Sequence, residues 1–330
     1  MSEQDEWCLI ESDPWIFTDL LKKIGVKGVQ MTEICSLEDI DQLNSIYGLL
    51  FLFKCKNISS SPDFANGGTF IEDKQICDIY FAKQVIPNAC ATQAIINMLL
   101  NLKDVNDLEL GDVLSNFQEF TAMMDSETKG HAIGNCLSIK EAHNSFSKPN
   151  LVSLEGESNK GTDAFHYVAF VPISGRLVEL DGLKNYPIDH GSLSFNWIKT
   201  ASNVLKNRMP ESETGDFNLL AMTFDRKKAY TEELTKLQAH LSESVADPAE
   251  LQRISELEQL LADEEKQQLR YEVDGIRRNH NWTPFIVETM KLLAKYGGLS
   301  KLMEDQLRHV AAQTNDTEKA SINSDKTDLN

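Results

Sequence analysis

Residues 83–100 read KQVIPNACATQAIINMLL, and the rest of the fold can be placed outward from this stretch. Pro87 and Asn88 end the preceding segment, and small and apolar residues with helical spacing follow. Cys90 is therefore predicted at a helix N-terminus, where unpaired N–H groups and the helix dipole favour a reactive thiolate. Gln84 could donate an N–H to an oxyanion formed at a carbonyl that Cys90 attacks. The alternative is that Cys90 is a small buried core residue.

Two later segments supply a base and a carboxylate. Residues 163–172, DAFHYVAFVP, alternate as a strand does and place His166 near its start. Residues 176–182, RLVELDG, are predicted to form the second strand of a hairpin that ends at Asp181. Cys90, His166 and Asp181 thus follow one another as a nucleophile, a base and the group that orients the base. The alternative is that the histidine and the aspartate are ordinary surface or core residues.

Together the segments QVIPNACATQA, AFHYV and ELDG resemble the ubiquitin C-terminal hydrolases, a family of papain-like cysteine proteases. The sequence WCLIESDP at 7–14 resembles the start of that family. The sequence RRNHNWTPF at 277–285 resembles the C-terminal extension of its proteasome-associated subfamily. The resemblance covers about residues 7–303. Visible departures are Pro87 directly before the asparagine of the motif and Cys35, where the family pattern has tryptophan.

The resemblance implies an α/β (α+β) fold, with a central, mainly antiparallel sheet flanked by helices. This fold is papain-like and knotted, a rare exception to unthreaded connections, and is followed by an α-helical extension. The implied domains are a catalytic domain at 1–225, a helical extension for partner docking at 226–312 and a disordered tail at 313–330. A crossover loop at about 148–164 would span the active-site cleft. Such a loop would let an unfolded tail pass and exclude a folded domain.

The implied activity is that of a thiol-dependent ubiquitin C-terminal hydrolase, a deubiquitinating cysteine protease. It would hydrolyse the peptide or isopeptide bond after the C-terminal glycine of ubiquitin through a thioester intermediate, at the proteasome. Cys90 is the nucleophile, His166 the general base and acid, and Asp181 orients His166, while Gln84 stabilises the oxyanion. The predicted substrate-binding residues are Leu9, Ile10, Glu11, Asn88, Ala164 and Phe165. No cofactor and no metal are expected.

Alternatives remain for the function and for single residues. The same Cys-His-Asp chemistry serves amide transferases and other papain-like proteases. The chain could also be a non-catalytic scaffold or adaptor that acts through its helical extension. Leu9 and Ile10 could pack inward, as apolar residues beside a helix start commonly do. His131 and His143 are expected to be structural or surface residues, because nothing places a carboxylate or thiol beside them.

Composition limits the partners. The net charge of −19 over 330 residues argues against general nucleic-acid binding. It either keeps the protein soluble without any partner or attracts a basic partner. The resemblance favours a share in the second role, because the tail of ubiquitin carries arginines. No apolar run approaches the ~20 residues of a membrane span. The acidic start and the six cysteines without CxxC spacing predict a reducing, cytoplasmic and nuclear location. The partners implied by the resemblance are ubiquitin and ubiquitinated proteins, the proteasomal ubiquitin receptor and a chromatin remodelling complex.

Overall fold

The computed structural model describes most of the chain. The described residues are 6–37, 46–55, 65, 67–72, 79–103, 105, 107–147, 164–193, 196–208, 217–243 and 247–298. All of the predicted crossover loop except its last residue, and the whole predicted tail, lie outside these ranges. The part of the predicted extension that follows residue 298 lies outside them as well.

The chain divides into two compact units. The first comprises Met1–Ser147 with Gly156–Asp274, and the second comprises Lys148–Glu155 with Gly275–Asn330. The predicted domain boundary at residue 225 falls between the last strand and the helix that follows it. The compact units separate farther along the chain, inside the long helix α8 (Pro248–Asn279).

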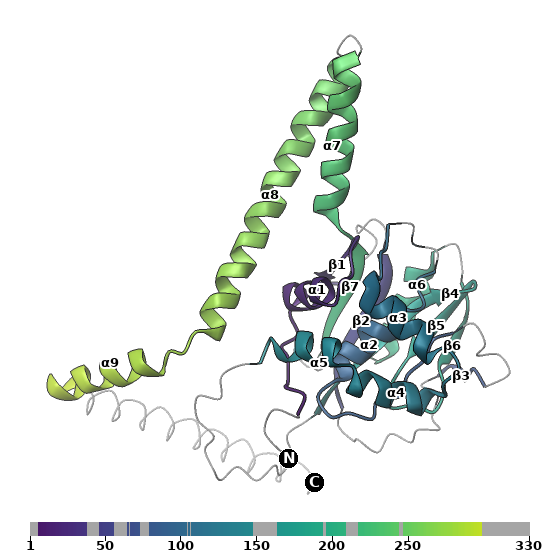
Figure 1. Cartoon of the computed structure of the whole chain (residues 1–330), viewed down its shortest axis with the longest axis horizontal. Coiled ribbons are helices and arrows are strands. Elements are labelled where there is room, and N and C mark those ends of the chain that lie inside the picture. Colours follow the sequence, from purple (N-terminus) through teal and green to yellow (C-terminus); the bar gives the residue numbers. More distant parts are fainter. Residues whose placement is uncertain are drawn as a thin grey trace, which may run out of the picture. The chain divides into compact units, whose positions relative to one another are not determined.

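The first unit is built on one sheet, which confirms the predicted fold class (Figure 1). Its order is β1-β7-β2-β4-β5-β6-β3, and every adjacent pair is antiparallel. The strands are β1 (Val29–Glu33), β2 (Ile46–Cys55), β3 (Thr69–Phe70), β4 (Ala164–Ile173), β5 (Arg176–Leu180), β6 (Ile188–Ser192) and β7 (Phe217–Phe224). Because β2 lies between β4 and β7, the two halves of the chain form one inseparable sheet.

Both faces of this sheet are buried. Successive side chains of a strand point to opposite faces, so in β2 Leu50 joins one hydrophobic cluster while Leu49 and Phe51 join another. The first face is covered by α1 (Pro14–Lys23), α2 (Cys90–Leu99), α3 (Gly111–Thr121), α4 (Ser126–Asn135) and α5 (Leu137–Asn144). The second face is covered by α6 (Trp197–Arg208). This burial explains why β2 is a nearly continuous apolar run.

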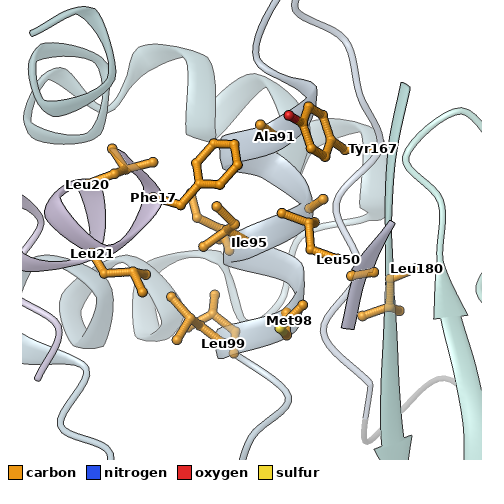
Figure 2. Close-up of a cluster of buried hydrophobic side chains, with 14 of the residues drawn as sticks. Phe17, Leu20, Leu21, Leu50, Ala91, Ile95, Met98, Leu99, Tyr167 and Leu180 are labelled. Atoms are coloured by element: carbon orange, nitrogen blue, oxygen red, sulfur yellow. The ribbon is translucent and has the colours of Figure 1, made fainter. Parts of the chain in front are cut away.

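The helix α1 begins and ends where its sequence predicts. The Asp13 carboxylate caps it by accepting the Trp15 N–H at 2.8 Å, and Pro14 occupies the first turn. Gly25 follows with a φ of 94°, the left-handed conformation that glycine adopts without strain. Phe17 on the inner face of α1 lies against the middle of α2 at Ile95, as Figure 2 shows. Thus α1 fixes α2, the helix that begins with Cys90.

The predicted extension begins with two long helices that follow the last strand of the sheet. The helix α7 (Arg226–Glu243) pairs with α8 through ion pairs between Arg226 and Glu264 and between Arg253 and Glu233, each at 2.8 Å. Leu257 of α8 is fully buried, whereas Leu251 at the start of the helix is 51% exposed. In the described parts of the chain no helix is long and apolar enough to cross a membrane.

The second unit contains the helix α9 (Thr283–Lys295). The Trp282 indole Nε1–H donates to the Arg277 carbonyl oxygen at 2.8 Å, which fixes the turn that leads into this helix. None of the α9 residues is buried. Its exposed apolar side chains are Phe285, Ile286, Val287, Met290 and Leu292. An apolar face of this kind is typical of a docking surface.

Candidate active site

Cys90 is the first residue of α2, as predicted. The chain reverses into the helix at Asn88, whose φ of 64° is left-handed, a conformation that asparagine tolerates better than most residues. The Asn88 Nδ2–H donates to the Trp7 carbonyl oxygen at 3.1 Å and so anchors this turn to the start of the chain. The helix cap is Ala89, which has no side-chain oxygen. The N–H groups of the first turn are therefore not used by a side-chain cap.

The surroundings of the Cys90 sulfur correct one expectation. Burial raises the pKa of the Cys90 thiol, and the N–H groups of Ala91, Tyr167 and Cys90 itself lower it only in part. The helix N-terminus therefore contributes as predicted but does not by itself make Cys90 a thiolate. A thiol of this kind needs a general base to become a nucleophile.

His166 and Asp181 meet where β4 and β5 separate. The last pair between these strands is Ala169 with Leu180, so His166 and Asp181 extend beyond the ladder on neighbouring strands. The His166 Nε2 and Asp181 Oδ1 atoms are 2.7 Å apart, and both residues are at least 95% buried. Tyr167, the residue directly after His166, turns its backbone N–H toward the Cys90 sulfur. His166 and Asp181 are thus in direct contact, and the Cys90 sulfur lies by the backbone of the residue that follows His166.

The state of Asp181 determines the tautomer of His166. Burial opposes ionisation of Asp181, but hydrogen bonds from His166 and the Leu183 N–H, with the positive charge of Lys184, lower its pKa. An ionised carboxylate only accepts hydrogen bonds, so the proton on this side of the ring is on His166 Nε2. His166 Nδ1 is then the unprotonated nitrogen that can take a proton from a thiol.

Gln84 lies beside the residue that follows Asp181. The Gln84 N–H donates to the Gly182 carbonyl oxygen at 2.8 Å. A Cβ atom added to Gly182 would lie 3.0 Å from the Gln84 Cβ, so a side chain at position 182 would require Gln84 to shift by a few tenths of an ångström. On the other side, a Cβ added to Gly130 of α4 would lie 2.1 Å from the Lys83 carbonyl oxygen. The segment that carries Gln84 is therefore held between α4 and the Asp181–Gly182 turn.

The predicted substrate-binding residues do not all reach the surface. Leu9 is 74% exposed and Phe165 is 51% exposed, and Asn88 is exposed as well. Glu11 is half-buried, and Ala164 is the first residue of β4. The Ile10 side chain is only 6% exposed and belongs to the core, so inward packing describes Ile10 while Leu9 points outward. Leu9 and Phe165 therefore present large apolar side chains at the surface.

His143 is a structural residue, as predicted. It is fully buried, and its Nδ1 and Nε2 atoms lie 2.7 Å from the Thr92 hydroxyl and the Cys8 carbonyl oxygen. Burial lowers the pKa of His143, and a hydrogen bond with the Cys8 backbone opposes this only in part. A neutral ring therefore donates from Nε2 to the carbonyl and accepts from Thr92 at Nδ1. His143 fastens the first residues of the chain to α2, close to Asn88 and Cys90.

The described residues contain no group of histidine, cysteine, aspartate and glutamate side chains that could hold a metal ion. A cavity of about 570 Å³ lies between α1, β1 and the α7–α8 pair, and Cys90, His166 and Asp181 are not among its lining residues. Its charged lining includes Arg226 and Glu264, which pair with each other.

Comparisons with known proteins agree with this geometry. Residues 7–210 match the family described as ubiquitin carboxyl-terminal hydrolase, family 1, and residues 254–299 match a second family described as ubiquitin carboxyl-terminal hydrolases. The ubiquitin carboxyl-terminal hydrolase ubh-4 of Caenorhabditis elegans is 37% identical over 335 residues, which cover 100% of this chain and 98% of the relative. Isozyme L5 of Dictyostelium discoideum is 34% identical, with 92% of this chain and 96% of that protein covered.

A solved structure shows the same likeness. The crystal structure of Trichinella spiralis UCH37 bound to ubiquitin vinyl methyl ester superposes with a TM-score of 0.63. The two proteins are 35% identical in sequence, and the alignment covers 80% of this chain and 99% of that one. The likeness thus extends over nearly the whole of the other protein.

Proposed function

This chain belongs to the ubiquitin carboxyl-terminal hydrolase family, a family of cysteine peptidases, and on that premise we propose how its residues act. It hydrolyses the peptide or isopeptide bond after the C-terminal glycine of ubiquitin, with Cys90, His166 and Asp181 as its triad. The observation that carries the proposal is the 2.7 Å contact between His166 and Asp181, next to the Tyr167 N–H that faces Cys90. These residues come from distant parts of the chain, and nucleophilic catalysis explains why they lie near one another.

The reaction is an acyl transfer in two steps. His166 Nδ1 removes the Cys90 proton, and the thiolate attacks the carbonyl carbon of the terminal glycine of ubiquitin. The Gln84 amide and the Cys90 backbone N–H stabilise the oxyanion. The imidazolium of His166 gives its proton to the amine as the carbon–nitrogen bond breaks. The amine departs, and ubiquitin remains bound to Cys90 through a thioester. His166 then takes a proton from water as the water oxygen attacks the thioester carbonyl carbon. The carbon–sulfur bond breaks, His166 returns the proton to the Cys90 thiolate, and ubiquitin leaves with a free carboxyl group.

Gln84→Ala tests the oxyanion assignment. We expect kcat to fall about 10²–10³-fold with KM little changed, because a donor aimed at the oxyanion acts only in the transition state. The assay is hydrolysis of a fluorophore joined by an amide bond to the C-terminus of ubiquitin. Gln118→Ala is the matched control, since its side chain donates to the Leu100 carbonyl oxygen on α2 instead. An unchanged kcat in Gln84→Ala would remove this residue from the mechanism.

The helical extension is the second functional part of this proposal. Residues 226–312 dock the enzyme on the proteasomal ubiquitin receptor, and a chromatin remodelling complex is a further partner. The protein then works in the cytoplasm and the nucleus. The exposed apolar face of α9 supports the docking role, because an unpartnered face of this kind favours association. A pure scaffold has no need of an ordered triad, and for that reason we place catalysis first.

Phe285→Asp tests the docking role. Phe285 is 64% exposed on α9, so the substitution removes an apolar anchor without opening a core. We expect the affinity for the proteasomal ubiquitin receptor to fall about tenfold or more, as for loss of an interface anchor. The control is Lys291→Asp, which also changes charge on α9 but lies at a polar position, where Lys291 pairs with Glu288. Equal affinities of the two variants, measured by calorimetry, would contradict the docking role.

A further inference from the structure

One extended segment near the active site has an unusual set of hydrogen-bond partners. Residues 79–84 lead to Gln84 but belong to none of the described strands. The Tyr80 N–H donates to Asn101 Oδ1 at 2.8 Å, and the Asn101 Nδ2–H donates back to the Tyr80 carbonyl oxygen at 2.7 Å. The Ala82 N–H donates in the same way to Asn97 Oδ1 at 2.9 Å, and Asn97 Nδ2 returns a bond of 3.0 Å. Side chains thus take the place of a neighbouring strand.

Gln93 extends this pattern toward Cys90. Its Nε2–H donates to the Ala82 carbonyl oxygen at 2.7 Å. The three amides occupy positions 93, 97 and 101, one per turn, on α2 and the turn directly after it. Four residues of a helix rise about 6 Å, and two residues of an extended chain span about 6.6 Å. Successive turns of the helix can therefore bind alternate residues of the segment, as Asn101 binds Tyr80 and Asn97 binds Ala82. The same spacing places Gln84 beside Gln93, which lies one helical turn after Cys90.

The packing around Gly182 supports this placement independently. A Cβ added to Gly182 would lie 3.1 Å from the Gln84 nitrogen and 3.4 Å from Gln93 Nε2, so both residues border the same glycine. Gln93 is 1% exposed, and among the described residues its Oε1 atom has no hydrogen-bond partner. A buried amide with an unsatisfied oxygen costs stability that an apolar residue would not. This cost indicates a role for Gln93 other than packing.

We propose that Gln93, Asn97 and Asn101 are positioning residues that bind the backbone of residues 80–82 to α2 and so hold Gln84 at a fixed place relative to Cys90. Cys90, the nucleophile, is the first residue of α2. Gln84, the oxyanion donor, lies in a segment that is bound to the same helix, so the two positions are fixed relative to each other. This inference rests on the oxyanion role proposed for Gln84. It predicts that replacing an amide near Gln84 lowers kcat only when the Gln84 side chain is present.

The test is a double-mutant cycle between Gln93→Met and Gln84→Ala. Gln93→Met keeps a similar shape, and the Ala82 carbonyl oxygen still accepts from Asn97, so the fold is retained. We expect kcat for the ubiquitin–fluorophore amide to fall about 10- to 100-fold, as for a small misplacement of a catalytic group, with KM within about twofold. In the Gln84→Ala background the same substitution should change kcat by less than about twofold, because the donor it places is already gone.

Two further variants separate positioning from stability. Asn101→Leu leaves the Tyr80 N–H and carbonyl oxygen without these bonds, far from Gln84, so it should lower the unfolding midpoint more than Gln93→Met but kcat less. Met98→Leu is the matched control, since it is a volume-conserving change at a fully buried position of α2 that bonds no part of the segment. Its kcat should be unchanged in both backgrounds.

Each other outcome contradicts the inference. An equal loss from Gln93→Met with and without Gln84 would show independent action and would overturn it, while the oxyanion role would stand. A decrease in kcat that is proportional to the decrease in the unfolding midpoint among the amide variants would overturn it too. Full kcat in Gln84→Ala alone would overturn the oxyanion role, and this inference with it.

Discussion

Cys90→Ala is expected to reduce turnover to background, on the order of 10⁶-fold below the unmodified protein, because the covalent step has no other nucleophile. The affinity for ubiquitin should be retained. Cys90 is the first residue of α2, and alanine keeps the helix, its N–H groups and the neighbouring Asn88 turn in place. The measurements are hydrolysis of the ubiquitin–fluorophore amide and, separately, calorimetric binding of ubiquitin.

Two of the other free thiols provide the controls for this variant. Cys35 is exposed and Cys136 is half-buried, and neither is among the groups that face Cys90, His166 or Asp181. Cys35→Ala and Cys136→Ala should therefore keep full turnover. Full turnover in Cys90→Ala, or its loss in Cys35→Ala, would move the nucleophile elsewhere. Loss of both turnover and ubiquitin binding, with the protein folded, would contradict the separation of binding from chemistry.

Asp181→Asn is expected to lower kcat about 10⁴-fold while the protein remains folded. In the unmodified protein the Leu183 N–H and His166 Nε2 share the Oδ1 atom of Asp181, at 2.9 Å and 2.7 Å. An asparagine that turns its amide nitrogen toward His166 therefore gives up the Leu183 bond. An amide is neutral and can donate to His166 Nε2, so the proton of the ring can move to Nδ1. His166 would then face Cys90 with a donor instead of an acceptor and could not take the thiol proton.

The stability of this variant should depend on pH in a defined direction. The pKa of Asp181 is lowered in the folded protein, because its hydrogen bonds and nearby positive charges outweigh the effect of burial. The ionised carboxylate therefore stabilises the fold above the ordinary aspartate pKa, about 3.9, and this contribution is lost as the pH falls through the lowered value. The stability gap between the unmodified protein and Asp181→Asn should narrow on acidification in urea titrations at several pH values.

Asp189→Asn is the matched control for Asp181→Asn. Asp189 is also a mostly buried aspartate whose pKa is lowered: burial opposes ionisation, but hydrogen bonds from Arg176 and the Gly191 N–H outweigh it. It is not bonded to His166, so this variant should share the pH-dependent loss of stability and keep most of kcat. Similar kcat values for Asp181→Asn and Asp189→Asn would contradict the tautomer argument.

Local sequence signals predicted much of the fold. Asp13, Pro14 and Gly25 have side chains or conformations that act within a few residues, so the limits of α1 could be predicted. The same holds for Cys90 at the start of α2 and for the β4–β5 hairpin, whose turn at Ser174 and Gly175 uses positive φ at both residues. The order of Cys90, His166 and Asp181 was informative because each has a known role in nucleophilic catalysis.

The remainder depends on contacts between distant segments. Helix α4 was not predicted, because Gly130 and Gly134 lower helix propensity, and the need for Gly130 lies in the close approach of Lys83. The amides of Gln93, Asn97 and Asn101 are ordinary polar residues in sequence, and only the structure gives them one segment to bind. The raised pKa of Cys90 likewise follows from burial, which a helix N-terminus does not reveal.

The measurement that tests the central claim most directly is reaction of the full chain with ubiquitin whose C-terminus carries a thiol-reactive electrophile, followed by peptide mass mapping. The account predicts one adduct, on Cys90, that forms rapidly in the unmodified protein and more slowly in Asp181→Asn. The same electrophile on a short peptide without ubiquitin should react far more slowly. An adduct on another cysteine, or no adduct on the folded protein, would contradict the assignment of Cys90 as the nucleophile that cleaves after ubiquitin.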